Sequence, residues 1–259
     1  MQPLQDIVVI DGHMQTMYMA VYADKLLLLD GGCLCDVDLI MQTIRDMGRP
    51  ISQLKTVVVT HMHPDHAGGA IELKKRTECT IASAVKPKQW YGGVAGRVMY
   101  GVDVGLAYWM SNRQNKPLKN LLFPRTLHPD VALSEGDAVP HFADWQILET
   151  AGHTDRDLSV YHADTKQIYT ADLLIKLRHK YVSPFPIYLP DTYRASLKKV
   201  RDLQPEQVMM AHGGKQAVAR EVFDDLIARS PKYPLNAYET IKHKLTWRFR
   251  GKQKVADAI

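Results

Sequence analysis

The sequence predicts an α/β protein in which two mixed β-sheets pack together with helices outside, a four-layer αββα sandwich. Strand-like apolar runs alternate with helix-like segments, the connections are short, and a sheet-then-helix order occurs in each half of the chain. Strand, helix, strand in succession predicts right-handed crossover units. The length of 259 residues favours one domain over residues 1–259, although two small domains also fit.

Three apolar runs at residues 6–10, 17–23 and 25–32 predict the first strands, with a turn at Asp24 and Lys25. Residues 36–48 predict a helix, because apolar side chains recur on one face and Gly48 suits a C-terminal cap. A helix over 70–77 follows, flanked by strands at 54–60 and 80–85. The first half therefore reads as a sheet with crossover helices on one side.

The second half repeats this order. Strands are predicted at 145–152, 158–164 and 167–175, and the last two are joined by a turn at residues 164–166. Helices at 192–203 and 218–230 flank a strand at 206–214. This half is expected to form the second sheet and its outer helices.

Residues 86–129 form an insert between the halves, in which aromatic residues are mixed with glycines. Aromatic rings supply contact area and glycines allow bending, so the insert suits an apolar lid over a site. In that case Tyr91, Tyr108 and Trp109 are the expected substrate contacts. Ordinary helical packing, or the contact of a homodimer, is the alternative.

The excess positive charge is confined to one end of the chain. The segment from Lys232 to residue 259 has seven Lys or Arg and two acidic residues, and so accounts for the formal charge of +5. A basic helical tail of this kind is more often a solvated helix than a nucleic-acid-binding arm. Nucleic acid is therefore not an expected partner.

The cysteines and the lack of targeting features in the sequence predict the cellular compartment. No apolar run approaches the roughly 20 residues of a membrane span, and the first residues lack the pattern of a secretory signal. The cysteines, Cys33, Cys35 and Cys79, cannot all pair, which suits a reducing compartment. A cytoplasmic protein with buried thiols is expected, with a metal near Cys33 or Cys35 as the alternative.

Four ligand-type residues gather in the segment THMHPDHAGG, directly after the strand at 54–60: His61, His63, Asp65 and His66. Residues two apart at the end of a strand point the same way, so both first imidazoles can face one point. Three further residues of this type, His153, Asp172 and His212, each end another apolar run. Five histidines and two aspartates suit two metal ions with nitrogen and oxygen ligands.

These segments together resemble the metallo-β-lactamase superfamily of metallohydrolases. The resemblance runs through VYADKLLLLDGG, THMHPDHAGG, TAGHT, YTADLL and VMMAHGG, over about residues 7–215. It implies two divalent metal ions, zinc first, with iron and manganese as alternatives. It further implies the ligand sets: one metal held by His61, His63 and His153, the other by Asp65, His66 and His212, with Asp172 bridging them.

The same resemblance implies a hydrolase that uses a metal-bridging hydroxide on an ester-like bond in a small acyl-bearing or anionic substrate. Thioesters, lactones and other carboxylic esters come first, although Ile175 stands where lactone-cleaving relatives often have tyrosine. Asp65 is the expected proton shuttle, with metal orientation as its rival role. Phosphodiester or RNA cleavage, a mononuclear iron persulfide dioxygenase, and a non-catalytic metal-binding module are the alternatives.

The loop after His153 departs from the family pattern, since it reads GHTDRDLS. Its acidic residues, Asp155 and Asp157, can act as acceptors for the outer N–H of a ligand imidazole. Solvated turn acids are the alternative reading of the two positions.

Overall fold

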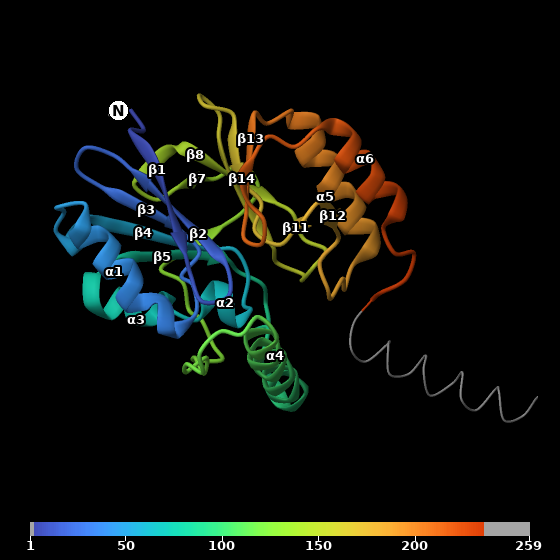
Figure 1. Ribbon diagram of the computed structural model, residues 1–259, viewed down its shortest axis with the longest axis horizontal. Coiled ribbons are helices and arrows are strands. Elements are labelled where there is room, and N and C mark those ends of the chain that lie inside the picture. Colours follow the sequence, from blue (N-terminus) through green and yellow to red (C-terminus); the bar gives the residue numbers. More distant parts are fainter. Residues whose placement is uncertain (1–2, 236–259) are drawn as a thin grey trace, which may run out of the picture.

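The computed structural model describes residues 3–235 and shows two six-stranded β-sheets packed face to face (Figure 1). Side chains of both sheets interlock in a shared core that contains Leu27 and Val58 from one sheet and Trp145 and Val160 from the other. Helices cover the outer face of each sheet, so the predicted αββα layering is confirmed.

The first sheet alternates its side chains between two cores. Leu27 and Leu29 face the second sheet, whereas Leu26 and Leu28 face the helices. Its first three strands are antiparallel, and the rest are parallel with crossover helices between them. The elements are β1 (Asp6–Asp11), β2 (Thr16–Val21), β3 (Leu26–Leu29), α1 (Val37–Asp46), β4 (Leu54–Val59), α2 (Pro64–Ala67), α3 (Ala70–Thr77), β5 (Thr80–Ala84) and β6 (Val131–Leu133), with short 3-10 turns at Leu34–Asp36 and Ile51–Gln53.

The second sheet has the strand order β14-β13-β10-β9-β8-β7, in which only β10 and β13 pair in parallel among the described strands. Helices α5 and α6 cover its outer face through a core that includes Tyr193, Leu197 and Phe223. The elements are β7 (Ala138–Val139), β8 (Phe142–Glu149), β9 (Leu158–His162), β10 (Gln167–Tyr169), α5 (Pro190–Leu203), β13 (Gln207–Met210), β14 (Gly214–Gln216) and α6 (Arg220–Arg229), beside a small hairpin of β11 (Ile175–Leu177) and β12 (Lys180–Val182).

A turn interrupts the strand predicted around Asp172. The segment 167–175 was expected to be continuous, but β10 ends at Tyr169 and β11 starts at Ile175. A turn intervenes because the N–H of Leu173 donates to the carbonyl of Thr170 at 2.9 Å, and Ala171 adopts a positive φ of 45°. Asp172 therefore lies in this turn and not at a strand end.

The insert contains one long helix, α4 (Gly93–Arg113), which extends away from the sheets below α2 in Figure 1. Within residues 3–235, no helix is both long and apolar enough to cross a membrane. The predicted basic tail falls almost wholly on residues 236–259, outside the described part of the chain.

Candidate metal centre

All seven ligand-type side chains predicted from the sequence lie at one edge of the two sheets. They follow β4, β8, β10 and β13 or lie in α2, and they form two groups whose candidate ligand atoms are within 4.8 Å of one another. The first group is His61, His63, His153 and Asp172, and the second is Asp65, His66 and His212. The fold thus brings together residues from four separate parts of the chain.

Three ring nitrogens converge in the first group. Nδ1 of His63 lies 3.0 Å from Nε2 of His61 and 2.9 Å from Nε2 of His153. These separations are close to the roughly 3.3 Å between nitrogens on a tetrahedral metal with bonds of about 2.0 Å. The three imidazoles are therefore arranged as ligands around one point.

Asp172 connects the two groups, because its two carboxylate oxygens face different partners. Oδ2 lies 3.5 Å from Nε2 of His153 and 4.0 Å from Nε2 of His61. Oδ1 lies 3.5 Å from Nε2 of both His66 and His212. A carboxylate that is shared by two cations has this geometry, with one oxygen directed at each cation.

The second group depends on the short helix α2 directly after β4. His63 precedes the helix and Pro64 occupies its first turn, where a missing N–H costs nothing. Two glycines then allow the chain to pass close to the β3 loop, since a Cβ on Gly69 would lie 2.3 Å from the carbonyl oxygen of Gly31. This tight path directs Asp65 and His66 towards the site, with Oδ2 of Asp65 at 3.3 Å from Nε2 of His212.

Asp30 is the main support of the second group. It is fully buried, and its carboxylate accepts hydrogen bonds from Nδ1 of His66 at 2.7 Å and the Tyr169 hydroxyl at 2.7 Å. It also accepts the N–H of Thr60 at 2.8 Å, and so connects β3 to the end of β4. Asp30 stands in the segment VYADKLLLLDGG, and the sequence signal for its role is a lone acid after four leucines.

The outer nitrogen of His153 bonds to the main chain and to neither nearby acid. Its Nδ1 donates to the carbonyl of Pro186 at 2.6 Å. Asp157 instead accepts the N–H of Thr154 at 2.7 Å, and Asp155 pairs with Arg156 at 2.6 Å. The expectation that Asp155 and Asp157 accept from a ligand imidazole is therefore wrong for His153, because both carboxylates already have closer partners.

Neighbouring charges set the protonation of the site. Burial lowers the pKa of His63 to about 3. Burial also lowers the pKa of His212, but the carboxylates of Asp172 and Asp65 outweigh it and raise this pKa. Burial raises the pKa of Asp65, but the imidazoles of His66 and His212 outweigh it and lower the pKa to about 2. His63 thus supplies neutral nitrogen and Asp65 ionised oxygen, the forms that bind divalent metals, whereas His212 must release a proton when it binds a metal.

The donor set fits a divalent metal by a second criterion. Buried polar atoms normally have hydrogen-bond partners. Within residues 3–235, Nε2 of His66 and Oδ1 of Asp172 are buried without one, and both point into the site. Imidazole nitrogen together with carboxylate oxygen suits zinc, iron and manganese alike.

The insert residues predicted to contact substrate lie at different depths. Tyr91 is fully buried and donates to Oδ2 of Asp103 at 2.9 Å. The Tyr108 hydroxyl accepts the N–H of Leu121 at 3.1 Å, and Trp109 is 52% exposed beside Arg113. Their contact with a substrate stays a prediction.

Two other aromatic residues lie beside the first group. The ring of Trp90 lies 6.5 Å from that of His63, and the ring of Tyr188 lies 5.2 Å from that of Trp90. Tyr188 comes from the loop before α5, so its position in the sequence carries no signal of this role. These two rings form an apolar wall beside the imidazoles.

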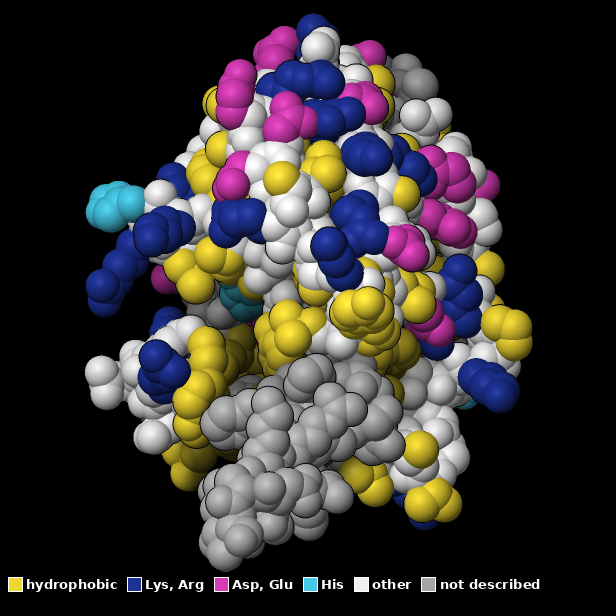
Figure 2. Space-filling view, turned by 90° about the vertical axis from the view of Figure 1, so that its right-hand side faces the viewer, with side chains coloured by type: hydrophobic (Ala, Val, Ile, Leu, Met, Phe, Trp, Pro, Cys, Tyr) yellow, Lys and Arg dark blue, Asp and Glu magenta, His cyan; other side chains and the backbone are white. Residues whose placement is uncertain are grey.

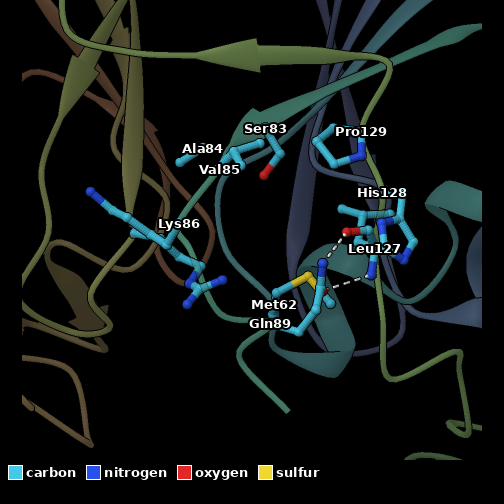
Figure 3. A pocket seen from close by; sticks show the side chains of 10 residues that line it. Met62, Ser83, Ala84, Val85, Lys86, Gln89, Leu127, His128 and Pro129 are labelled. Atoms are coloured by element: carbon cyan, nitrogen blue, oxygen red, sulfur yellow. Dashed lines mark hydrogen bonds between the residues drawn. The ribbon is translucent and has the colours of Figure 1, made fainter. Parts of the chain in front are cut away.

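A cavity of about 220 Å³ adjoins the centre at the end of β5 (Figure 3). Its walls include Met62, which lies between two of the candidate ligands, but none of the seven ligands themselves. Figure 3 shows the Gln89 amide closing one wall through hydrogen bonds to the main chain of Leu127, at 3.0 and 3.2 Å. The cavity is therefore separate from the metal centre.

The cysteines do not join the two groups. Cys33 is buried and Cys35 half-buried, and both lie close to Asp36 in a third cluster. The Asp36 carboxylate accepts the N–H groups of His13 and Cys33 at 2.8 and 2.9 Å. This arrangement explains the short helical turn at residues 34–36, and it agrees with the expectation of buried free thiols.

Comparison with known proteins identifies the class of this chain. A model of the metallo-beta-lactamase superfamily matches residues 10–212, and the chain therefore belongs to that superfamily. This agrees with the resemblance seen in the sequence.

Two curated relatives are similar over most of the chain. The probable metallo-hydrolase YflN of Bacillus subtilis (strain 168) is 24% identical over 209 residues, which cover 73% of this chain and 75% of the relative. A hydroxyacylglutathione hydrolase of Rhodopseudomonas palustris (strain BisB5) is 25% identical over 209 residues, covering 72% and 66%.

Solved structures share the fold. A metallo-beta-lactamase family protein of Thermus thermophilus, TTHA1429, has a TM-score of 0.64 at 18% identity, over 86% of this chain and 78% of that one. ETHE1 from Myxococcus xanthus has a TM-score of 0.57 at 18% identity, over 88% and 93%.

Proposed function

We propose that this protein is a dinuclear metallohydrolase that cleaves an ester-like bond, with thioesters as the first substrate class. The observation that carries the proposal is Asp172, whose Oδ2 faces His61 and His153 while its Oδ1 faces His66 and His212. A centre for a single ion would need only one of these two sets.

The proposed ligands follow the two groups. His61, His63 and His153 would hold one ion, Asp65, His66 and His212 the other, and Asp172 both. When bound, two divalent ions lower the pKa of a coordinated water and polarise the oxygen of the bond to be cleaved. Zinc is the first candidate, with iron and manganese fitting the same donor atoms.

Asp65 is the proposed carrier of the proton that the leaving group needs. Its side chain is 14% exposed, so it faces the accessible side of the centre, and its Oδ2 lies 3.3 Å from His212. A carboxylate in that position can take a proton at Oδ2 and pass it on to the departing oxygen or sulfur. Orientation of a metal by Asp65 is the rival role.

Substrate choice is proposed to lie with the aromatic residues around the centre. Trp90 and Tyr188 provide an apolar wall beside the first group, and Tyr91, Tyr108 and Trp109 of the insert remain predicted contacts. Such surfaces exclude water and accept an acyl chain. The three free thiols support the reducing cytoplasm as the compartment.

Thioesters come first because a relative that is 25% identical is named for hydrolysing an acylglutathione. Lactones and other carboxylic esters follow. Phosphodiesters and a mononuclear iron dioxygenase reaction are alternatives, but the second group of ligands, with its buried support Asp30, favours two ions over one.

The test is a substrate panel with protein that has been analysed for metal. Thioesters of increasing acyl length, lactones, carboxylic esters and phosphodiesters are compared by kcat/KM, before and after chelator treatment and again after metal is restored. We expect thioester cleavage that chelation abolishes and metal restores. Cleavage of phosphodiesters alone, or oxygen consumption with a persulfide at one iron per chain, would overturn the proposal.

A further inference from the structure

The candidate ligand imidazoles differ in what their outer nitrogens contact. Nδ1 of His66 bonds to Asp30 at 2.7 Å, Nδ1 of His153 to Pro186 at 2.6 Å, and Nδ1 of His61 to the Thr60 hydroxyl at 3.1 Å. His63 is reversed, because its Nδ1 faces the other imidazoles and its Nε2 points outward. That Nε2 is buried and has no hydrogen-bond partner within residues 3–235.

Asp103 is the acid that faces this nitrogen. Its Oδ2 lies 3.8 Å from Nε2 of His63, and it is the one carboxylate within 4.0 Å of either His63 ring nitrogen in the described part of the chain. Both side chains are about 10% exposed. Asp103 belongs to α4, so the contact joins the insert to the end of β4.

The chemistry of His63 calls for an acceptor at this position. If Nδ1 binds a metal as a neutral imidazole, Nε2 must carry the proton and becomes a donor. Metal-bound histidines almost always give this outer N–H to a carboxylate, a carbonyl or water. We propose that Asp103 is a positioning residue of the metal centre, which accepts the Nε2–H of His63 and fixes the tautomer and orientation of its ring.

Tyr91 holds Asp103 in place for this role. The hydroxyl of Tyr91, a buried residue, donates to the same Oδ2 at 2.9 Å. This hydrogen bond restricts the orientation of the Asp103 carboxylate. The 3.8 Å gap to His63 exceeds a hydrogen bond, and a shift of about 1 Å or one bridging water closes it. The insert is thereby a structural part of the metal centre as well as a neighbour of it.

The inference rests on the proposed metal centre but not on the proposed substrate. Three variants remove the contact in steps: Asp103→Asn keeps an acceptor oxygen without the charge, Asp103→Leu removes the acceptor, and Tyr91→Phe removes only the anchor. Metal affinity is measured by chelator competition, and ring geometry by the visible spectrum of the cobalt(II)-substituted protein. Neither readout needs turnover.

We expect Asp103→Leu to bind metal about 10- to 100-fold more weakly, the range for loss of such partners, with a changed cobalt spectrum. Asp103→Asn should lose less, and Tyr91→Phe should fall between Asp103→Asn and wild type. Should Asp103→Leu fail to fold, the other two variants decide the question by the same readouts.

A matched control exists elsewhere in the molecule. Asp144 lies 3.2 Å from Nε2 of His162 and also accepts the Tyr22 hydroxyl, the same trio of residue types away from the metal centre. Asp144→Asn should lower thermal stability but leave metal affinity and the cobalt spectrum unchanged. Wild-type affinity and spectrum in both Asp103 variants would overturn the inference, as would metal losses no greater than those of Asp144→Asn. A wild-type protein that binds no metal would instead contradict the proposed centre itself.

Discussion

The metal centre and the insert lie side by side, yet they are built in opposite ways. In the centre, largely buried imidazoles and carboxylates occupy the short helix α2 and the loops that follow β4, β8, β10 and β13. In the insert, the outward face of α4 exposes apolar residues, with Val94 at 79% and Val98 at 64%. One region is fixed by hydrogen bonds, and the other leaves hydrophobic surface uncovered.

Helices α5 and α6 do not share this feature. Helices α5 and α6 present paired charges, such as Arg201 with Asp224 and Arg229 with Asp225. Figure 2 shows charged side chains of both signs intermixed over the upper part of its face, whereas hydrophobic side chains gather in the lower part. From this difference we expect the chemistry to depend on the residues after the strands, and discrimination among substrates to depend on the insert.

The largest expected effect is that of Asp172→Ala. Because Asp172 contacts both groups, its loss should remove at least one metal per chain and lower kcat/KM by more than about 100-fold, the upper range for loss of an outer partner alone. Metal analysis and thioester kinetics measure both effects. The control is Asp164→Ala, an exposed turn residue, which should change neither. A variant that retained all its metal would place Asp172 outside the centre.

A smaller effect is expected for Asp30→Asn. Asparagine tolerates the positive φ of 66° at this position, so the backbone is retained while the charge that accepts from His66 is lost. Metal affinity should fall about 10- to 100-fold, and the free energy of unfolding by about 2 kcal/mol. Chelator competition measures the metal affinity, and urea unfolding measures the free energy of unfolding. Asp130→Asn, at a surface pair with Lys74, serves as the control, and an equal metal loss there would refute the role of Asp30.

The smallest effects are expected for aromatic residues of the insert. An acyl chain gains about 0.8 kcal/mol per buried CH₂, or about fourfold per methylene. Trp90→Ala, beside His63, should reduce this gain in kcat/KM across thioesters of increasing length, and Trp109→Ala, which is more exposed, should reduce it less. Metal content should stay at the wild-type level in both. A larger effect at Trp109 would indicate that α4 closes over the centre as a lid.

Much of this architecture could be predicted from sequence because its signals are local. The apolar run before His61 and the period of α1 determine strand and helix without reference to the rest of the chain. The ligand types were found because four of them stand together in THMHPDHAGG and the other three each end an apolar run. The end of β10 was missed, since a turn closed by Thr170 and Leu173 leaves no pattern in an apolar run.

The supports of the centre were harder to predict because they act across the fold. Asp103 is the sole charged residue between Val98 and Asn112, which is a signal in itself, but its partner His63 is 40 positions away in sequence. Pro186 supports His153 through a main-chain carbonyl, which any residue could supply. Which residues meet in such contacts depends on how the helices and loops pack.

The most direct test of the dinuclear centre is a metal titration of chelator-treated protein. Metal is returned in steps, and thioester hydrolysis is followed together with bound metal per chain. Because Asp172 faces both groups, activity should continue to rise until two equivalents are bound. Full activity at one equivalent, with no further ion taken up, would contradict a dinuclear centre.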